Sequence, residues 1–210
     1  MKRFKKVICI LCVIFMFATL VQPVNAQKFD KTTAKKKVSV SYKKTSNGIL
    51  AIYKNKNKTA LQITSTMHFL AGNKKDISKE IRVNNCVSGK STATIFFKAP
   101  IDENGNYVNY SSYKSSFSVA KSKYKGYAKK ITVSSELKVI EGAFTAVNMS
   151  GKDLSNIEAT IAYYDGNNNL IGCKIQYLNC FKKKSIDQFT VDYVEGTSPS
   201  RVKVYINTAY

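Results

Sequence analysis

The stretch IQYLNCFKKKS, from Ile175 to Ser185, repeats the pattern of IRVNNCVSGKS, from Ile81 to Ser91, at an offset of 94 positions. When the windows are extended to 171–185 and 77–91, six of 15 aligned positions are identical. Self-similarity at a fixed spacing is the signature of an internal repeat. We therefore expect both stretches to form the same strand and turn in two copies of one domain.

The match continues upstream of these windows. VSVS at 38–41 corresponds to ITVS at 131–134, and Asn55 corresponds to Asn148. We expect two tandem β-sandwich domains that arose by internal duplication. The predicted organisation is a basic N-terminal segment at 27–36, a first domain at 37–121, a linker at 122–128 and a second domain at 129–210.

The local pattern is that of strands. Apolar residues alternate with polar or small ones over 157–163 and again over 171–177, and DGNNN at 165–169 between them is a hairpin signal. Similar short runs are found at 37–43, 48–54, 91–98, 107–119, 130–135, 142–148, 185–193 and 201–207. This spacing, without a long helical period, predicts an all-β protein with six or seven strands in each copy.

The second copy resembles a known family. NMSG at 148–151, IAYYD at 161–165, a turn, an Ile-rich strand and a late β run look like the FxLYD domains of secreted bacterial proteins. Tyr164 and Asp165 match the pattern, whereas Ile161 and Tyr163 depart from it, and MHFLA at 67–71 of the first copy is degenerate. The resemblance implies an immunoglobulin-like sandwich in an exported, envelope-associated protein. It brings no catalytic residues.

The N-terminus predicts export. Four basic residues at positions 2–6 precede an apolar run from Val7 to Ala18, and VNA at 24–26 offers small residues for cleavage. An uncleaved membrane anchor is the alternative, but 12 apolar residues fall short of the roughly 20 that span a bilayer. We predict a signal peptide at 1–26 and a secreted, extracellular or cell-wall-associated protein.

Charge is concentrated in the first copy. The whole chain has a formal charge of +21, and residues 27–125 hold 20 basic and 5 acidic residues. This excess points to a polyanionic partner, while solvation of exposed faces by lysine is the alternative. Only Arg82 and Arg201 are arginines after position 26. Lysine lacks the planar fork that reads phosphates and bases, so specific nucleic-acid recognition is disfavoured.

Few residues suit catalysis or metal binding. His68 is the only histidine, and it shares a strand face with polar residues. After residue 26 the cysteines are Cys86, Cys173 and Cys180, an odd number for which free thiols are expected, with a Cys173–Cys180 or Cys86–Cys180 bridge as the exception. The acidic and amide residues at 102–106 and 165–169 mimic calcium ligands but complete no EF-hand, which favours turns. We predict no catalytic residue, cofactor or metal site.

The strongest interaction candidate is the segment 107–130, where tyrosines interleave with lysines and the first copy is longer than the second. Aromatic rings beside ammonium groups can stack on sugars or bases while the charges hold an anionic backbone. The alternative is an edge strand protected by lysine, followed by a solvated linker. The candidate residues, which include a second cluster in the 54–58 turn, are Lys54, Lys56, Lys58, Tyr107, Tyr110, Tyr113, Lys114, Lys121, Lys123, Tyr124, Lys125, Tyr127, Lys129 and Lys130.

These observations predict an exported, non-enzymatic module that binds anionic polymers or partners at a bacterial cell envelope. Wall teichoic acid of a Gram-positive bacterium is the concrete example. A structural or assembly module with no polyanion specificity is the alternative. A hydrolase built on Cys86 or His68 and a non-specific nucleic-acid binder are the other classes considered.

Overall fold

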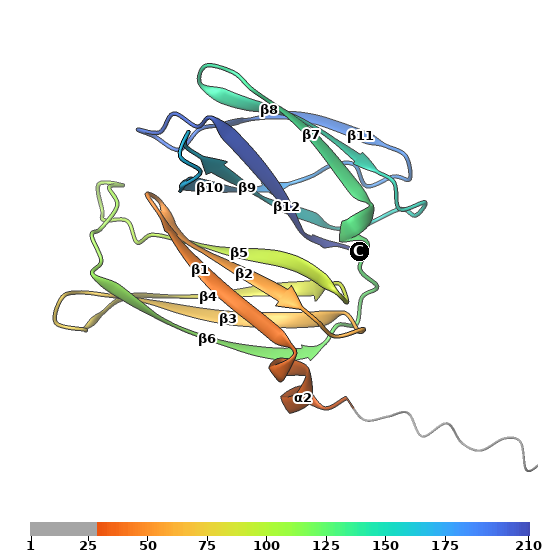
Figure 1. Cartoon of the computed structure of the whole chain (residues 1–210), viewed down its shortest axis with the longest axis horizontal. Coiled ribbons are helices and arrows are strands. Elements are labelled where there is room, and N and C mark those ends of the chain that lie inside the picture. Colours follow the sequence, from red (N-terminus) through yellow and green to blue (C-terminus); the bar gives the residue numbers. More distant parts are fainter. Residues whose placement is uncertain (1–28) are drawn as a thin grey trace, which may run out of the picture. The chain divides into compact units, whose positions relative to one another are not determined.

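Short antiparallel strands make up almost all the regular structure of the chain (Figure 1). The computed structural model describes residues 29–210, and the predicted signal peptide lies outside them. The elements are α2 (Lys31–Lys36), β1 (Val38–Thr45), β2 (Gly48–Asn55), β3 (Leu61–Leu70), β4 (Asp76–Val87), β5 (Ser91–Lys98), β6 (Ser112–Lys121), η1 (Ala128–Lys130), β7 (Ile131–Leu137), β8 (Glu141–Asn148), β9 (Ile157–Tyr164), β10 (Leu170–Tyr177), β11 (Ile186–Asp192) and β12 (Arg201–Ala209).

The strands form four three-stranded sheets, two in each half of the described chain. The first half contains the sheets β1-β2-β5 and β4-β3-β6, and the second half contains β7-β8-β11 and β10-β9-β12. Adding six to each strand number of the first half gives the strand at the same place in the second half. The pairing order of the strands is therefore the same in both halves. The predicted all-β class is confirmed, as is the hairpin of β9 and β10.

The structure departs from the sequence prediction in two places. The predicted strand at 107–119 begins only at Ser112, because Tyr107 instead pairs with Ile101 in an isolated bridge. Val108 N also donates to Pro100 O, which closes a loop between β5 and β6. In addition, part of the basic N-terminal segment forms the short helix α2.

Each half has an aromatic interior between its two sheets. In the first half, the Tyr53 ring lies edge-on to Phe117 at 5.5 Å, and the Tyr53 hydroxyl forms a hydrogen bond with Ser65 at 2.6 Å. In the second half, Phe144 stacks on Phe189 at 5.2 Å beside the buried Tyr163. Burial alternates from residue to residue along β3 and β8, as a sandwich requires.

Some strands are buried on both faces because sheets of the two halves meet. Leu50 and Phe96 of the first half share a buried cluster with Ala162, Tyr164 and Cys173 of the second. The region Lys31–Tyr210 is accordingly one compact unit. The clean alternation of exposed and buried residues in a free sandwich is therefore lost in β2, β5 and β9.

Buried amides join the two halves by hydrogen bonds. Asn207 Oδ1 accepts from Thr94 N at 3.0 Å and from Thr94 Oγ1 at 2.6 Å. Asn47 Nδ2 donates to Cys173 O at 2.7 Å, and Asn47 Oδ1 accepts from Cys173 N at 3.1 Å. Buried polar groups paired in this way fix one register between the sheets.

Candidate functional site

Four lysines from three segments line one open cleft of about 480 Å³. Lys54 is the exposed residue near the end of β2, Lys56 follows that strand, Lys90 precedes β5 and Lys129 belongs to η1. We call this site the lysine cleft; its other lining residues are Asn55, Ser91 and Thr92. The Lys129 ammonium donates to Lys90 O at 2.7 Å, which ties η1 to the β4–β5 turn.

Asn55 holds the two turns of the lysine cleft together. Its side chain is fully buried, and Nδ2 lies within hydrogen-bond distance of Thr59 O, Val87 O and Ser88 O. Asn55 Oδ1 accepts from Asn57 N at 3.0 Å. One amide thus satisfies backbone groups in the 56–60 turn and at the end of β4, which places the lysines of both segments side by side.

Gly89 allows the same two turns to approach closely. A Cβ at this position would lie 2.1 Å from Lys58 O, well inside van der Waals contact. The gap left by the missing side chain lets Lys90 N donate to Asn57 O at 2.9 Å. Lys90 itself has a φ of 51°, a conformation that the turn imposes on a residue with a side chain.

The lysine cleft contains no acidic side chain. Within residues 29–210, none of its four lysines takes part in an ion pair. Ammonium groups held in one cleft repel one another, and salt only partly screens this repulsion. A bound anion would relieve it, so the site is electrostatically complementary to a polyanion.

The equivalent end of the second half is built alike but is partly neutralised. Asn148 Nδ2 approaches Lys152 O, Phe181 O and Lys182 O, as Asn55 approaches its three carbonyls. There, however, the Asp153 carboxylate pairs with the Lys182 ammonium at 3.3 Å and accepts from Lys183 N. The hydrogen bond from Lys183 N and then the one from Lys182 hold the Asp153 pKa below its usual value.

Several other candidate lysines lie at the same end of the first half as the lysine cleft. Lys121 pairs with Leu61 at the end of β6, and Ser122 N donates to Ala60 O in the turn that contains Lys58. Lys130 follows Lys129 directly. Lys37 also belongs to this region, since its carbonyl accepts from Lys56 N at 2.9 Å. The remaining lysines of the linker, Lys123 and Lys125, lie over the rings of Tyr124 and Tyr127.

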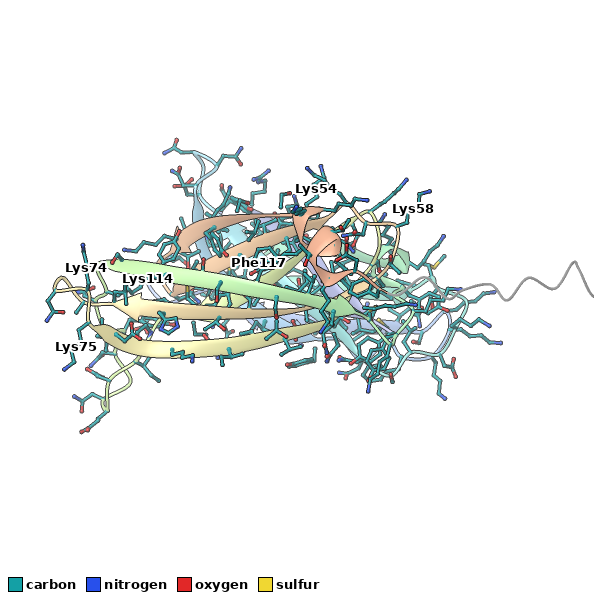
Figure 2. All side chains as sticks on the ribbon, turned by 90° about the horizontal axis from the view of Figure 1, so that it is seen from below. Lys54, Lys58, Lys74, Lys75, Lys114 and Phe117 are labelled. Carbon is teal, nitrogen blue, oxygen red and sulfur yellow. The ribbon has the colours of Figure 1, made fainter. Side chains whose placement is uncertain are left out.

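The rest of the predicted segment is far from this end. Lys114 pairs with His68 near the opposite end of β6, roughly 23 Å from Lys121 at about 3.3 Å per residue. Figure 2 shows Lys54 and Lys58 towards one end of the strands and Lys74, Lys75 and Lys114 towards the other. Segment 107–130 therefore does not form a single platform.

Most tyrosines of that segment are packed against other side chains. Tyr110 lies edge-on to Phe69 at 4.8 Å, and Tyr113 is tilted against Tyr42 at 5.9 Å. Tyr124 stacks on Tyr210 at 3.8 Å, and Tyr127 packs against the core of the second half. Tyr107 differs from these four, with 51% of its surface exposed.

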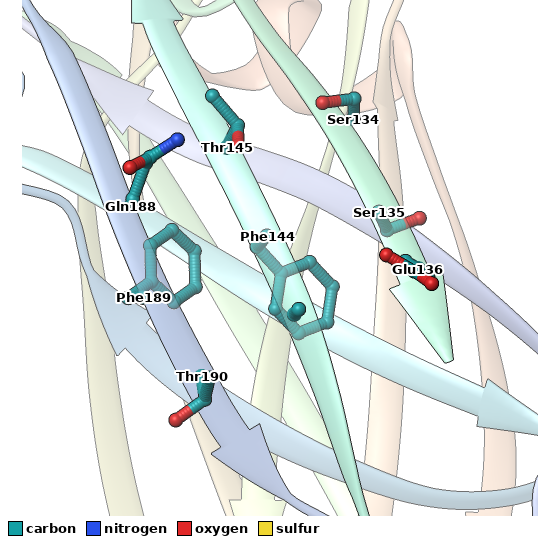
Figure 3. A pocket seen from close by; sticks show the side chains of 9 residues that line it. Ser134, Ser135, Glu136, Phe144, Thr145, Gln188, Phe189 and Thr190 are labelled. Atoms are coloured by element: carbon teal, nitrogen blue, oxygen red, sulfur yellow. The ribbon is translucent and has the colours of Figure 1, made fainter. Parts of the chain in front are cut away.

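A hollow of about 540 Å³ on the sheet β7-β8-β11 is a poor alternative for anion binding (Figure 3). Short hydroxyl and amide side chains such as Thr145, Gln188 and Thr190 surround it. Its one ionisable lining residue is Glu136, which would repel an anion.

The described residues give no support to the Cys86–His68 pair. His68 pairs with Lys79 in the β3–β4 register and forms a hydrogen bond with Asp76 at 2.8 Å. Lys79 is seven residues from Cys86 along β4, roughly 23 Å at about 3.3 Å per residue. Burial also raises the pKa of the Cys86 thiol, which keeps it protonated.

The three cysteines after residue 26 are free thiols, as their odd number predicted, and all three are buried. Burial raises the pKa of Cys173 to about 12 and also raises that of Cys180. Such thiols act as small apolar side chains rather than as nucleophiles or metal ligands.

In each of the two calcium-like loops, the aspartate side chain accepts hydrogen bonds from backbone N–H groups of the same loop. Asp102 Oδ1 accepts from Asn104 N and Asn106 N, and Asp165 Oδ1 accepts likewise from Asn167 N and Asn169 N. The turn interpretation is therefore confirmed. Across residues 29–210, no group of three or more metal-ligating side chains is found. No helix in that region has the length and apolar character to cross a bilayer.

The lysine cleft also contains a residue that sequence reasoning missed. Lys90 was visible only as a position shared with Lys184 in the repeat. Its role depends on the turn at Gly89, which brings it to Lys56 from a position 34 residues away in the sequence. No pattern in a single strand could reveal that contact.

Comparisons with protein-family models and with curated proteins found no match. Among solved structures, the chain is similar to the crystal structure of red sea bream transglutaminase, with 14% sequence identity and a TM-score of 0.28. The similarity covers 89% of this chain but 32% of the transglutaminase chain. The chain thus spans about a third of that structure, and a likeness this weak carries no argument about activity.

Proposed function

We propose that the protein is an exported, non-enzymatic module that binds anionic polymers of the cell envelope, such as wall teichoic acid. The observation that carries this proposal is the convergence of Lys54, Lys56, Lys90 and Lys129 on one cleft without an acidic neighbour. Repeated phosphates along a flexible polymer suit several hydrated point charges better than a single rigid fork. Binding of this kind is multivalent and sensitive to salt.

The difference between the two halves supports a specialised site rather than general solvation. Both halves hold equivalent turns with a buried asparagine, but the second half places Asp153 among its lysines. The first half instead has Lys54 and Lys56 where the second half has Val147 and Met149, and Lys129 of η1 joins these two lysines in the cleft. Positive charge is thus enriched at one turn of an otherwise shared framework.

We also propose that the two halves are FxLYD-type, immunoglobulin-like domains related by duplication. The identical pairing order of the sheets supports a duplication. The matching bonds of Asn55 and Asn148 support it independently, because such buried amide networks depend on the local backbone path. The export of the chain rests on the sequence of residues 1–26.

The test is co-sedimentation of the chain from Gln27 onward with purified cell-wall material, with and without its teichoic acid, across a salt series. The lysine-cleft variant carries Lys54→Gln, Lys56→Gln, Lys90→Gln and Lys129→Gln. The matched control carries Lys152→Gln, Lys182→Gln, Lys183→Gln and Lys184→Gln, which removes the same charge from the two equivalent turns of the second half.

We expect the unmodified chain to bind teichoic-acid-containing wall and to be released by moderate salt. A lysine near an anionic surface contributes up to about 1 kcal/mol, so loss of four should weaken binding at least about tenfold. The control should bind nearly as well as the unmodified chain. If both variants lose binding equally, net charge alone determines binding, and the proposal that the lysine cleft is the binding site is wrong.

The assembly role predicts a different result in the same assay. Ile81 and Val83, exposed on the sheet β4-β3-β6, offer apolar contact for a protein partner. Binding that survives salt and removal of teichoic acid, with a fixed stoichiometry, would favour that role over polyanion binding.

A further inference from the structure

A second cleft, of about 340 Å³, lies where the two halves meet. It combines three cationic side chains with two tyrosines, a pairing that the lysine cleft lacks. Its principal lining residues are Asn47, Arg82, Lys98, Tyr107, Lys174 and Tyr177, and we call it the junction cleft. Its volume is near the lower end of the range for small-molecule sites, about 300–1,000 Å³.

The junction cleft is separate from the lysine cleft. Lys98 ends β5, whereas Ser91 of the lysine cleft begins it. The seven intervening steps correspond to roughly 23 Å at about 3.3 Å per residue. A ligand of the junction cleft would therefore not compete directly with a polymer segment in the lysine cleft.

The floor of the junction cleft is fixed in place. Asn47, with 5% of its surface exposed, exchanges two hydrogen bonds with the backbone of Cys173. Phe96 is buried beside them. Because this floor belongs to the contact between the halves, the cleft is preformed, which lowers the entropy cost of binding.

The two tyrosines at the cleft keep much of their surface in water. Tyr107 is 51% exposed and Tyr177 is 58% exposed. Among the described residues, neither ring takes part in an aromatic or cation–π pair. Tyr107 is held there by the loop between β5 and β6, where the first half is longer than the second. The two rings are therefore free to pack on a flat or pyranose face.

Charges in and beside the cleft leave a small positive excess. Arg82 approaches the Glu80 carboxylate at 3.4 Å. Burial raises the pKa of Glu80, while Arg82 and Lys98 oppose that rise. Glu158, in an adjoining hollow of about 150 Å³, accepts from Asn207 at 3.1 Å. Three cations facing two carboxylates match a ligand with one negative charge rather than a polyanion.

We propose that the junction cleft binds a small ring compound that carries a single carboxylate. The ring packs against Tyr107 and Tyr177. The carboxylate is held by Lys98 and Lys174, neither of which forms an ion pair within residues 29–210. A hexuronic acid and an aromatic carboxylate share this chemistry.

The test is isothermal titration of the chain from Gln27 onward with glucuronate, benzoate and glucose. We expect one carboxylate to bind with a stoichiometry of one, and glucose to bind at least about tenfold more weakly, a difference of about 1.4 kcal/mol. Preference for glucuronate assigns a sugar acid, and preference for benzoate assigns an aromatic acid. If neither carboxylate binds up to millimolar concentration, the proposal is wrong.

Variants at the cleft separate a site from weak surface adsorption. The double change Tyr107→Ala and Tyr177→Ala should weaken binding at least about tenfold, and both side chains are exposed, so folding should be preserved. Phenylalanine at both positions keeps the ring faces and should retain binding. The four-lysine variant of the lysine cleft should bind the carboxylate unchanged. Equal affinity of the alanine and phenylalanine double variants would overturn the proposal.

Discussion

Replacement of Asn55 by alanine tests how the lysine cleft is built. The change removes a fully buried amide whose nitrogen lies 3.0–3.1 Å from three carbonyl oxygens. The two N–H groups of an amide can satisfy two of them at a time. The change also removes Oδ1, which accepts from Asn57 N and Asn57 Nδ2. Each partner left unpaired costs at most about 1–3 kcal/mol, and less where it is only partly buried.

We expect Asn55→Ala to lower the free energy of unfolding by about 3–4 kcal/mol. For a chain of this size, 1 kcal/mol corresponds to a shift of about 2–4 °C in Tm, so calorimetry should show a decrease of about 6–16 °C. Polymer binding should also weaken at a temperature where the variant is folded. The reason is that the turns carrying Lys56 and Lys90 lose their common anchor.

Asn148→Ala is the matched control because Asn148 makes the same set of contacts in the second half. It should lose similar stability while leaving polymer binding unchanged. If Asn55→Ala lowers stability by less than about 1 kcal/mol, water replaces the amide and the argument from buried hydrogen bonds fails. If both variants lose polymer binding equally, the link between Asn55 and the lysine cleft is refuted.

Three further predictions follow from single residues. Gly89→Ala should weaken polymer binding in the salt-series assay, because its Cβ would meet Lys58 O at 2.1 Å and force the two turns apart. Asn207→Ala should lower the free energy of unfolding by about 2–3 kcal/mol in urea, since Thr94 N and Oγ1 lose their acceptor. The Cys173 thiol should resist a thiol reagent in the folded protein and react after unfolding. Its pKa is raised from 9.0 to about 12, so stability should be unaffected below pH 9 and fall as the pH rises towards 12. The loss from this thiol is up to about 1.4 kcal/mol per pH unit, and urea titrations of Cys173→Ala should show a shallower fall.

The sequence allowed the strands to be predicted because each sheet has an inner face with apolar side chains at every second position. The hairpin at 165–169 was predictable for the same local reason, since turn residues separate two alternating runs. The loop at 99–111 could not be predicted from the sequence. Residues 107–111 have a strand-like composition, but no neighbouring strand pairs with them along their length. Tyr107 pairs locally with Ile101 instead.

Burial of the outer strand faces was also beyond sequence reasoning. Thr160, Ala162 and Tyr164 occupy the face of β9 that alternation assigns to solvent, yet all three are buried. Their burial requires contact with the first half, whose residues Leu50 and Phe96 lie more than 60 positions away in the sequence. The candidate sites were predictable only in part for the same reason. Lysine in the 54–58 turn was visible, but its convergence with Lys90 and Lys129 depends on tertiary contacts.

Because the two halves share buried contacts, the effect of their different charges on binding has to be tested in the whole chain. The pair Thr94–Asn207 and the cluster around Phe96 and Tyr164 are shared by both halves. A chain cut between residues 125 and 126 would expose these side chains in each fragment, so loss of binding by a fragment would report misfolding as readily as loss of a site. Whole-chain lysine variants avoid this problem because the two turns are exposed and equivalent. The repeated framework thereby lets the position of a charge be varied while the net charge stays constant, and that comparison separates a binding site from a merely basic surface.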